Sequence, residues 1–305
     1  MAIKIPGICC VIILQCFRKA LEGNIMKTKM TASQFENAVN RDPAWASKLT
    51  EPVEITEYCD MSGSEITHLS PMLHFAGNDD EENAANFAEC NQLKVAEGVF
   101  DGFVDFMDSG IEKIGDLVVT KPNENGEAAD FTCCYQLQIA GGTYHGSVKF
   151  NISGVREIEH LQIIRPNNDG LAASYCQCDK LRIARGVYPG CVDFLESGVE
   201  TIGDLQISDA NVYGDAAFFE NCRFLKVAEG TFPGFVDFAG SGLEKIRDLK
   251  VTQRNKAGFR ADFSKCKSLG RLPVEWYTQD VKMDVKLRKE HRAREILKSQ
   301  PTREI

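Results

Sequence analysis

Cysteines carry the most versatile chemistry in this sequence, because a thiol can form a disulfide, bind a metal ion or act as a nucleophile. The chain has 12 cysteines and five histidines. Five of the cysteines recur at intervals of 44 residues: Cys90, Cys134, Cys178, Cys222 and Cys266. No two cysteines have Cys-x-x-Cys spacing and the histidines are scattered, so we predict no metal site and no cofactor.

Aspartates also recur, and a row of carboxylates could serve as ligands or as acid–base groups. They occupy two positions of the repeat: Asp105, Asp193 and Asp237 at one, and Asp116, Asp204 and Asp248 at the other. Neither row has an evident partner histidine or a partner row of carboxylates beside it. We therefore expect these side chains to be solvated or hydrogen-bonded to turns, the alternative being a ligand-facing row.

Sequence motifs for catalysis are missing from the chain. It contains no Gly-x-Ser-x-Gly elbow, phosphate-binding loop, dinucleotide fingerprint or His-Glu-x-x-His sequence. A residue that recurs in every unit is required by every unit, whereas catalysis usually needs one singular site. We therefore expect no catalytic residues, no small-molecule substrate and no enzyme activity; an enzyme with a site hidden from sequence inspection is the less favoured alternative.

One repeat unit, residues 128–170, departs most from the others and could hold a contact site. His145 lies beside the recurrent Tyr144, Lys149 replaces the recurrent aspartate, and His160 replaces another aspartate. Arg156 stands where the other units have glutamate. Together they predict a basic patch that contacts an acidic protein partner. The alternative is neutral variation at the surface, where most substitutions matter little.

The elements that must position these residues are tandem repeats. A Phe/Tyr-x-x-Cys-x-x-Leu sequence occurs five times without an insertion, starting at Phe87, Phe131, Tyr175, Phe219 and Phe263. Each 44-residue unit contains two related halves, and each half resembles one coil of about 22 residues. Stretches such as 93–96 and 116–119 fit one brief parallel strand per coil, joined by polar turns.

Coil stacking decides what the recurrent cysteines can do. If a unit makes two coils stacked about 4.8 Å apart, successive cysteines lie about 10 Å apart, beyond the roughly 7 Å that a disulfide spans. We predict that they are small buried side chains in an interior layer. Cys59, Cys133, Cys176 and Cys191 lie outside this series. So many unpaired thiols favour the cytoplasm, with the cell surface or secretion as the alternative.

Phe-x-x-Cys-x-x-Leu followed by Ile-Gly resembles the BspA-like leucine-rich repeats of bacteria. The resemblance covers roughly residues 53–272. It implies a leucine-rich-repeat solenoid of short parallel strands and turns, and this chain's own end segments are expected to add a helical N-terminal cap and a C-terminal helix. The solenoid predicts a non-catalytic protein-interaction or scaffold function, and the family suggests a surface adhesin or host-contact protein as the alternative. In this chain cysteine or serine replaces the family's asparagine ladder.

The repeats divide the chain into a cap, an array and a tail. Full units are expected near 84–127, 128–171, 172–215 and 216–259, with partial units at 53–83 and 260–272. Residues 26–52 should form the N-terminal cap, whose helical segment 31–49 begins at an N-cap Ser33 with Glu36 completing a capping box. Phe35, Val39 and Trp45 could cover the first coil, and Pro43 could split the segment into two helices. Residues 273–305 should form the C-terminal cap and a basic helical tail.

Charge and the first residues bear on possible partners. The formal net charge is −9, so nucleic acid is not a favoured partner. The apolar run 8–17 is too short to cross a bilayer, which takes about 20 residues. Residues 1–25 are expected to be either a spurious upstream extension or a targeting segment, and a membrane is a partner only if residues 3–17 are such a segment.

Overall fold

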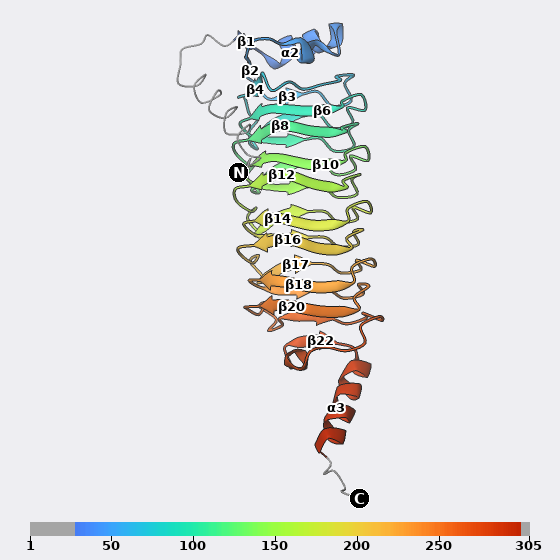
Figure 1. Ribbon diagram of the computed structural model, residues 1–305. Coiled ribbons are helices and arrows are strands. Elements are labelled where there is room, and N and C mark those ends of the chain that lie inside the picture. Colours follow the sequence, from blue (N-terminus) through green and yellow to red (C-terminus); the bar gives the residue numbers. More distant parts are fainter. Residues whose placement is uncertain (1–27, 300–305) are drawn as a thin grey trace, which may run out of the picture.

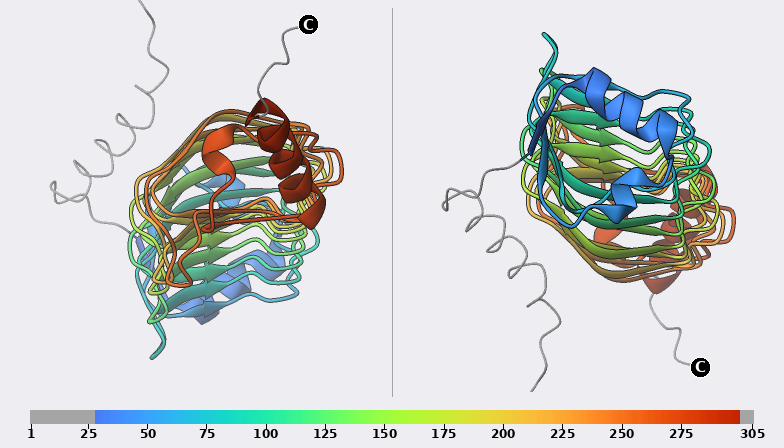
Figure 2. Two further views of the ribbon diagram at one scale, coloured as in Figure 1. Left: turned by 90° about the horizontal axis from the view of Figure 1, so that it is seen from below. Right: turned by 90° about the horizontal axis from the view of Figure 1, so that it is seen from above.

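Stacked coils of parallel β-strands form the body of the molecule, as the computed structural model shows for residues 28–299 (Figure 1). The expectations for residues 1–25 and 3–17 lie outside these described residues. Viewed along the stack, each coil is a flattened loop with a strand on either side (Figure 2). The fold is a β-solenoid-like repeat with few helices, as the tandem repeats predicted. Among the described helices, none is both long and apolar enough to cross a membrane.

Two strands belong to each coil, so the expectation of one strand per coil is wrong. One side of the coils carries longer strands: β1 (Thr28–Met30), β2 (Val53–Ile55), β4 (Leu73–Phe75), β6 (Val95–Phe100), β8 (Lys113–Val119), β10 (Ile139–Tyr144), β12 (Glu157–Ile163), β14 (Ile183–Tyr188), β16 (Thr201–Ile207), β18 (Val227–Phe232) and β20 (Lys245–Val251). The other side carries shorter strands: β3 (Cys59–Asp60), β5 (Asn83–Asn86), β7 (Phe103–Asp105), β9 (Glu127–Asp130), β11 (Ser147–Lys149), β13 (Leu171–Ser174), β15 (Cys191–Asp193), β17 (Asp215–Phe218), β19 (Phe235–Asp237), β21 (Ala261–Phe263) and β22 (Val281–Met283). We call these two surfaces the long-strand face and the short-strand face.

The two sheets differ in continuity. The short-strand face is one sheet of eleven strands, whereas the long-strand face is interrupted between β12 and β14 and again between β16 and β18. In the earlier coils the amide of Asp101 donates to the Phe75 carbonyl at 2.9 Å, and the amide of His145 donates to the Val119 carbonyl at 3.0 Å. Pro189 and Pro233 occupy the equivalent positions, and proline has no N–H to donate. These two prolines remove one link between successive coils at each interruption, which we call the β12–β14 seam and the β16–β18 seam.

Aromatic rings stack along the inside of the solenoid. Nine rings, all starting a Phe/Tyr-x-x-Cys or Phe-x-x-Ser sequence, lie 5.0–5.6 Å apart between centroids: Phe87, Phe106, Phe131, Phe150, Tyr175, Phe194, Phe219, Phe238 and Phe263. Edge-on contacts end the stack, with Phe75 at 5.6 Å on one side and Trp276 at 5.6 Å on the other. Such offset pairs contribute about 0.5–1.5 kcal/mol each beyond area burial. The stack thus runs from cap to cap.

The recurrent cysteines form a second interior ladder, in which they alternate with serines. Each of the five is buried, and its Sγ donates to a carbonyl of the preceding coil at 2.9–3.1 Å. Each Sγ also lies 3.4–3.5 Å from a serine Oγ: Ser64, Ser109, Ser153, Ser197 and Ser241. The prediction that these cysteines fill an interior layer is confirmed. Burial raises the pKa of Cys134 and Cys222 to about 12, so these thiols are not nucleophiles near neutral pH.

Helices cover the N-terminal end of the stack. Helix α2 (Ala32–Arg41) and the short helix η1 (Trp45–Lys48) lie on either side of Pro43, so the predicted split is confirmed. Phe35 and Val39 are buried in the core, as expected. The predicted N-cap is wrong: Thr31 Oγ1 accepts the Gln34 amide at 3.2 Å, and Gln34 Oε1 accepts the Thr31 amide at 2.9 Å. Because β1 ends at Met30, the chain turns at Thr31 and an equivalent capping sequence begins there.

The C-terminal end closes in a different way. Strand β22 continues the short-strand face beyond residue 272, into the segment expected to be only cap and tail. A short helix, η2 (Val274–Trp276), places Trp276 against the last ring of the stack. The charged helix α3 (Val285–Ser299) follows and extends from this end of the solenoid (Figure 1). The helix begins only at Val285, within the expected tail segment 273–305, because residues 281–283 form strand β22.

Candidate functional site at the β12–β14 seam

The four predicted contact residues do not form one patch. Lys149 lies on the short-strand face, where its Nζ is 2.6 Å from Glu127 Oε1 and 3.9 Å from Asp130 Oδ2. Arg156 directly precedes β12 and His160 lies within β12, on the long-strand side. His145 is in the turn that joins β10 to β11. Partial burial lowers its pKa, and the positive charge of Arg165 nearby lowers it further. Lys149 is thus neutralised, and Arg156 remains the strongest of the four candidates.

Arg156 breaks a row of ion pairs that runs along the coils. In three units a basic residue meets a glutamate of the next coil, with N–O distances of 2.9–3.2 Å: Lys94–Glu112, Arg182–Glu200 and Lys226–Glu244. In the remaining unit Gln138 holds the basic position and Arg156 the acidic one. The next basic residue of the row is Arg182, so two guanidinium groups are neighbours where the row otherwise alternates in sign.

A hollow of about 600 Å³ lies at this place and opens onto the β12–β14 seam. Six residues line it, four of them basic: Arg156, Glu157, Lys180, Arg182, Ile183 and Arg185. On a chain with net charge −9 such a cluster of cations is unusual. This part of the surface therefore differs in charge from the acidic chain as a whole.

Two of these arginines are held by backbone carbonyls. Arg182 Nη1 donates to the carbonyls of Asp179 at 2.7 Å and Gly198 at 3.0 Å. Arg185 Nε donates to the Ile158 carbonyl at 3.0 Å, so a side chain crosses the seam where backbone pairing is lost. A guanidinium group fixed in this way needs little further ordering before it binds a carboxylate. The walls of the hollow are thus preorganised.

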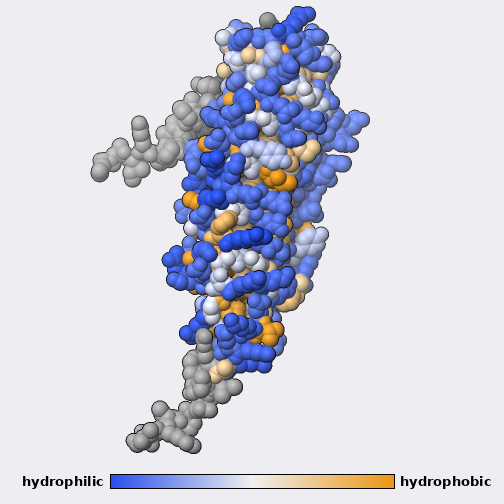
Figure 3. Space-filling view, turned by 90° about the vertical axis from the view of Figure 1, so that its right-hand side faces the viewer, coloured by the Kyte–Doolittle hydropathy of each residue, from blue (hydrophilic) through white to orange (hydrophobic). Residues whose placement is uncertain are grey.

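Exposed apolar side chains border the hollow. Ile183 and Val187, both on β14, are 44% and 63% exposed, and Phe224 is 55% exposed. The Phe224 ring centroid is 5.7 Å from the Arg182 guanidinium carbon. A space-filling view of the turn side shows hydrophobic residues as separate spots on a mainly hydrophilic surface (Figure 3). Arginine beside exposed aromatic and aliphatic groups is the composition of a protein-binding surface.

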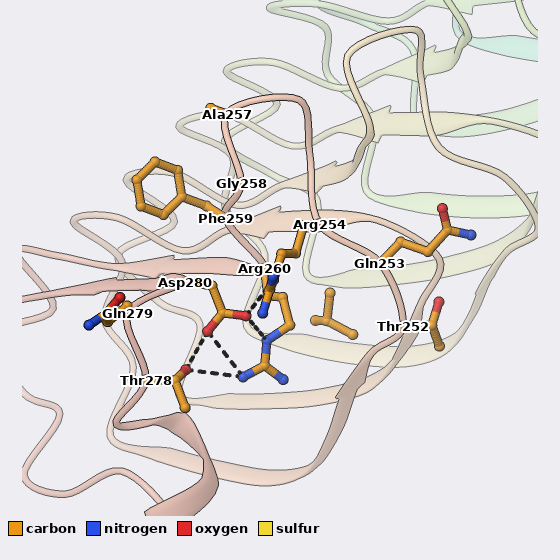
Figure 4. Close-up of a pocket in the computed structure, with 11 residues that line it drawn as sticks. Thr252, Gln253, Arg254, Ala257, Gly258, Phe259, Arg260, Thr278, Gln279 and Asp280 are labelled. Carbon is orange, nitrogen blue, oxygen red and sulfur yellow. Dashed lines mark hydrogen bonds and ion pairs between the residues drawn. The ribbon is translucent and has the colours of Figure 1, made fainter.

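In a second hollow, near the C-terminal end, both arginines that line it bind the same aspartate (Figure 4). Asp280 accepts hydrogen bonds from Arg254 Nε at 2.8 Å and Arg260 Nε at 2.7 Å, and also from the Thr278 hydroxyl. Burial of Asp280 favours the neutral form, but these hydrogen bonds outweigh it and hold its pKa well below its usual range. Arg260 also stacks over Trp276 at 5.2 Å. This cluster fastens the terminal cap to the array.

A polar cluster at the start of the long-strand face was not predicted. His74 Nε2 is 3.0 Å from Asp101 Oδ2, and the Thr120 hydroxyl donates to Asp101 Oδ1 at 2.6 Å. The aspartate is therefore the middle member, whereas activation of a hydroxyl nucleophile requires a base between the hydroxyl and the acid. These residues are 19–27 positions apart in sequence, which is about one coil. A comparison of polar residues spaced about one coil apart in the sequence would have identified this cluster.

The recurrent aspartates have roles in the fold. Asp105, Asp193 and Asp237 each accept the backbone amide two residues later at 2.8 Å, and Asn86 does the same at 2.9 Å. The expectation of turn-bonded carboxylates at this position is confirmed. Burial raises the pKa of all three aspartates, and that of Asp237 to about 6. Asp116, Asp204 and Asp248, the other series, are exposed to solvent, which agrees with the expectation that the aspartates are either solvated or bonded to turns.

Across residues 28–299, no three His, Cys, Asp or Glu side chains are grouped so as to hold a metal ion. No family model, curated protein or solved structure matches the chain.

Proposed function

We propose that this protein is a non-catalytic interaction solenoid that binds a protein partner through the long-strand face and the turns beside it. The observation that carries the proposal is the grouping of Ile183, Val187 and Phe224 with the arginines of the β12–β14 seam. Large exposed apolar side chains next to ordered guanidinium groups are typical of residues that dominate binding energy at interfaces. Extended solenoid surfaces are commonly used in this way.

The division of labour among residues supports the same proposal. Residues that recur along the array serve the fold: the cysteines donate within the core, and Asp105, Asp193 and Asp237 accept turn amides. At the seam, the basic residues Arg156, Lys180 and Arg185 do not recur at the equivalent positions of the other units. If the function depends on these non-recurrent residues, the recurrent residues need only form a scaffold that holds them in place. A binding protein requires no more than such a scaffold.

The repeat type is part of the proposal. We infer a relationship to BspA-like leucine-rich repeats from Phe-x-x-Cys-x-x-Leu, the 44-residue double coil and the helical N-terminal cap. Two strands per coil and the Cys–Ser ladder are features in which this chain differs from that pattern.

Site-specific photocrosslinking in the native cell tests the proposed function. A photoreactive amino acid at Val187 reports on the long-strand face, and one at Tyr213, which is 58% exposed and belongs to a turn before β17, serves as a control of similar exposure. We expect a discrete crosslinked protein from position 187 and none from position 213. Equal, diffuse crosslinking from both positions would contradict the proposal.

A further inference from the structure

We propose that the hollow at the β12–β14 seam binds an acidic peptide segment of the partner, with carboxylates on its basic groups and an apolar side chain on Ile183 and Val187. This inference rests on the proposed function and names the chemistry of the partner.

Charge balance around the hollow is the first argument. Arg182 is paired with Glu200 at 3.2 Å, and Arg185 approaches Glu159 at 3.9 Å. Within residues 28–299, neither Arg156 nor Lys180 forms an ion pair, although both line the hollow. Two cations and the Glu157 carboxylate, which also lines the hollow, therefore remain outside the internal pairs, and these three groups together carry a charge of +1. The natural partners of the two cations are carboxylates, which a guanidinium group can bind through two parallel hydrogen bonds.

The arrangement of the cations favours a segment over a single small anion. Arg156 belongs to one side of the seam, and Lys180 and Arg185 belong to the other. The exposed strand β14 continues from the hollow to Val187, which provides apolar surface a few residues further along. An extended acidic segment with one apolar side chain can contact both parts at once. A free phosphate would use only the cations.

The acidic body of the protein adds selectivity. An acidic partner is repelled by most of a surface with net charge −9 and is attracted where cations gather. Such complementarity raises the association rate and fixes the docking position more than it raises affinity. The same reasoning predicts that binding weakens as salt is added, since these cations are partly exposed.

Substitutions taken from the repeat itself can test the proposal with little risk to folding. Arg156→Glu introduces the residue that the other units carry at 112, 200 and 244, and Lys180→Gln introduces the residue found at 92 and 136. The matched control is Lys245→Glu with Lys250→Gln, on β20, the last strand of the long-strand face. Glutamate occupies the first position at 157 and glutamine the second at 162 and 206. Both double variants change the net charge equally.

Fluorescence anisotropy with labelled synthetic peptides gives the measurement. The probe is a Glu- and Asp-rich peptide with one leucine, and its counterpart has Gln and Asn in place of the acids. We expect the full chain to bind the acidic peptide at least about tenfold more tightly than the counterpart, and Arg156→Glu/Lys180→Gln to weaken that binding at least about tenfold. The control double variant should stay within about twofold. Equal weakening by both double variants would mean non-specific attraction and would overturn the inference.

Other occupants give distinct results. Inorganic phosphate that displaces the peptide at equal concentration, or vesicles of anionic lipid that bind the chain through the same two residues, would overturn the peptide assignment. If the crosslinked partner at position 187 persists in Arg156→Glu/Lys180→Gln, the proposed function stands and this inference fails. If no discrete partner crosslinks at all, the proposed function itself fails.

Discussion

Three buried tyrosines differ in whether their hydroxyl groups are hydrogen-bonded, and this difference gives the sharpest test of the core. Tyr188 Oη donates to the Arg185 carbonyl at 3.1 Å and is 3.1 Å from Tyr175 Oη. Because Tyr188 uses its proton on the carbonyl, Tyr175 donates to Tyr188. The hydroxyl of Tyr144 is fully buried with no hydrogen-bond partner among the described residues. Burial raises the pKa of Tyr144 far above its ordinary value, so this group stays neutral.

The expected free energies have opposite signs. Tyr144→Phe removes a buried hydroxyl that makes no hydrogen bond, so it should stabilise the fold by about 1–3 kcal/mol, the desolvation penalty of such a group. The ring fits, because Phe100 and Phe232 occupy this position in other units. Tyr188→Phe leaves the Tyr175 hydroxyl and the Arg185 carbonyl unpaired and should cost about 1–3 kcal/mol.

Equilibrium unfolding in urea measures both changes. The midpoint should rise for Tyr144→Phe and fall for Tyr188→Phe, with the slope unchanged so that the two shifts can be compared as free energies. Tyr175→Phe combined with Tyr188→Phe should cost less than the two single changes added together, since neither hydroxyl is then left alone. A loss of about 1 kcal/mol or more in Tyr144→Phe would refute the reasoning, because the hydroxyl would then have a stabilising partner.

Three further predictions concern a carboxylate, a proline and a core side chain. Burial raises the pKa of Asp237 to about 6, so its contribution to stability is fully present below about pH 4 and is lost as pH rises through about 6. Asp237→Asn, which can accept the turn amide as Asn86 does, should therefore gain about 2–3 kcal/mol relative to wild type between pH 4 and 7 in urea titrations; a pH-independent difference contradicts this. Pro189→His introduces an amide that can donate to the Ile163 carbonyl, a hydrogen bond that contributes about 0.5–1.5 kcal/mol. Removing the proline also gives the unfolded chain more conformational freedom, which costs about 0.4–1 kcal/mol. The two effects nearly cancel, so the free energy of unfolding should change little. Hydrogen exchange should nevertheless slow in β14, and unchanged protection there would show that the proline does not cause the seam. Leu181→Ala, at a fully buried position, should cost about 2–5 kcal/mol by thermal or urea unfolding, and a cost below about 1 kcal/mol would mean that this side chain is not packed in the interior layer.

Recurrence made the core predictable. A position that stays apolar at every 44th residue must face inward in every coil, which is why the phase of Cys178 and Leu181 could be assigned from the sequence. The short strands were missed for a physical reason. In Asn83–Asn86 both central alanines are buried, so the segment lacks alternation, and alanine has low strand propensity. Close approach of the coil to its own interior, rather than local preference, makes this segment a strand.

The site was only partly predictable, because its residues come from different coils. Arg156 was found because the other units have glutamate at its position. Lys180 and Arg185 belong to the next unit, and only the stacking of the coils brings them beside Arg156. The same stacking removes Lys149 from the candidates, since Glu127, one coil earlier, neutralises it. The cysteines also inform less about compartment than their number implied, because buried thiols with raised pKa values stay unreactive wherever the protein resides.

Two departures from the repeat coincide at one junction, and their coincidence distinguishes the β12–β14 seam from every other place in the array. Pro233 interrupts the β16–β18 junction just as Pro189 interrupts this one, but there the side-chain row still alternates, with Glu200 followed by Lys226. At the β12–β14 junction the backbone link is lost and Arg156 is followed by Arg182, so like charges meet where the coils are least tied. Arg182 is already paired with Glu200, whereas Arg156 forms no ion pair among residues 28–299. The proposed acidic segment would therefore supply the partner that Arg156 lacks and would bridge the two sides of the junction.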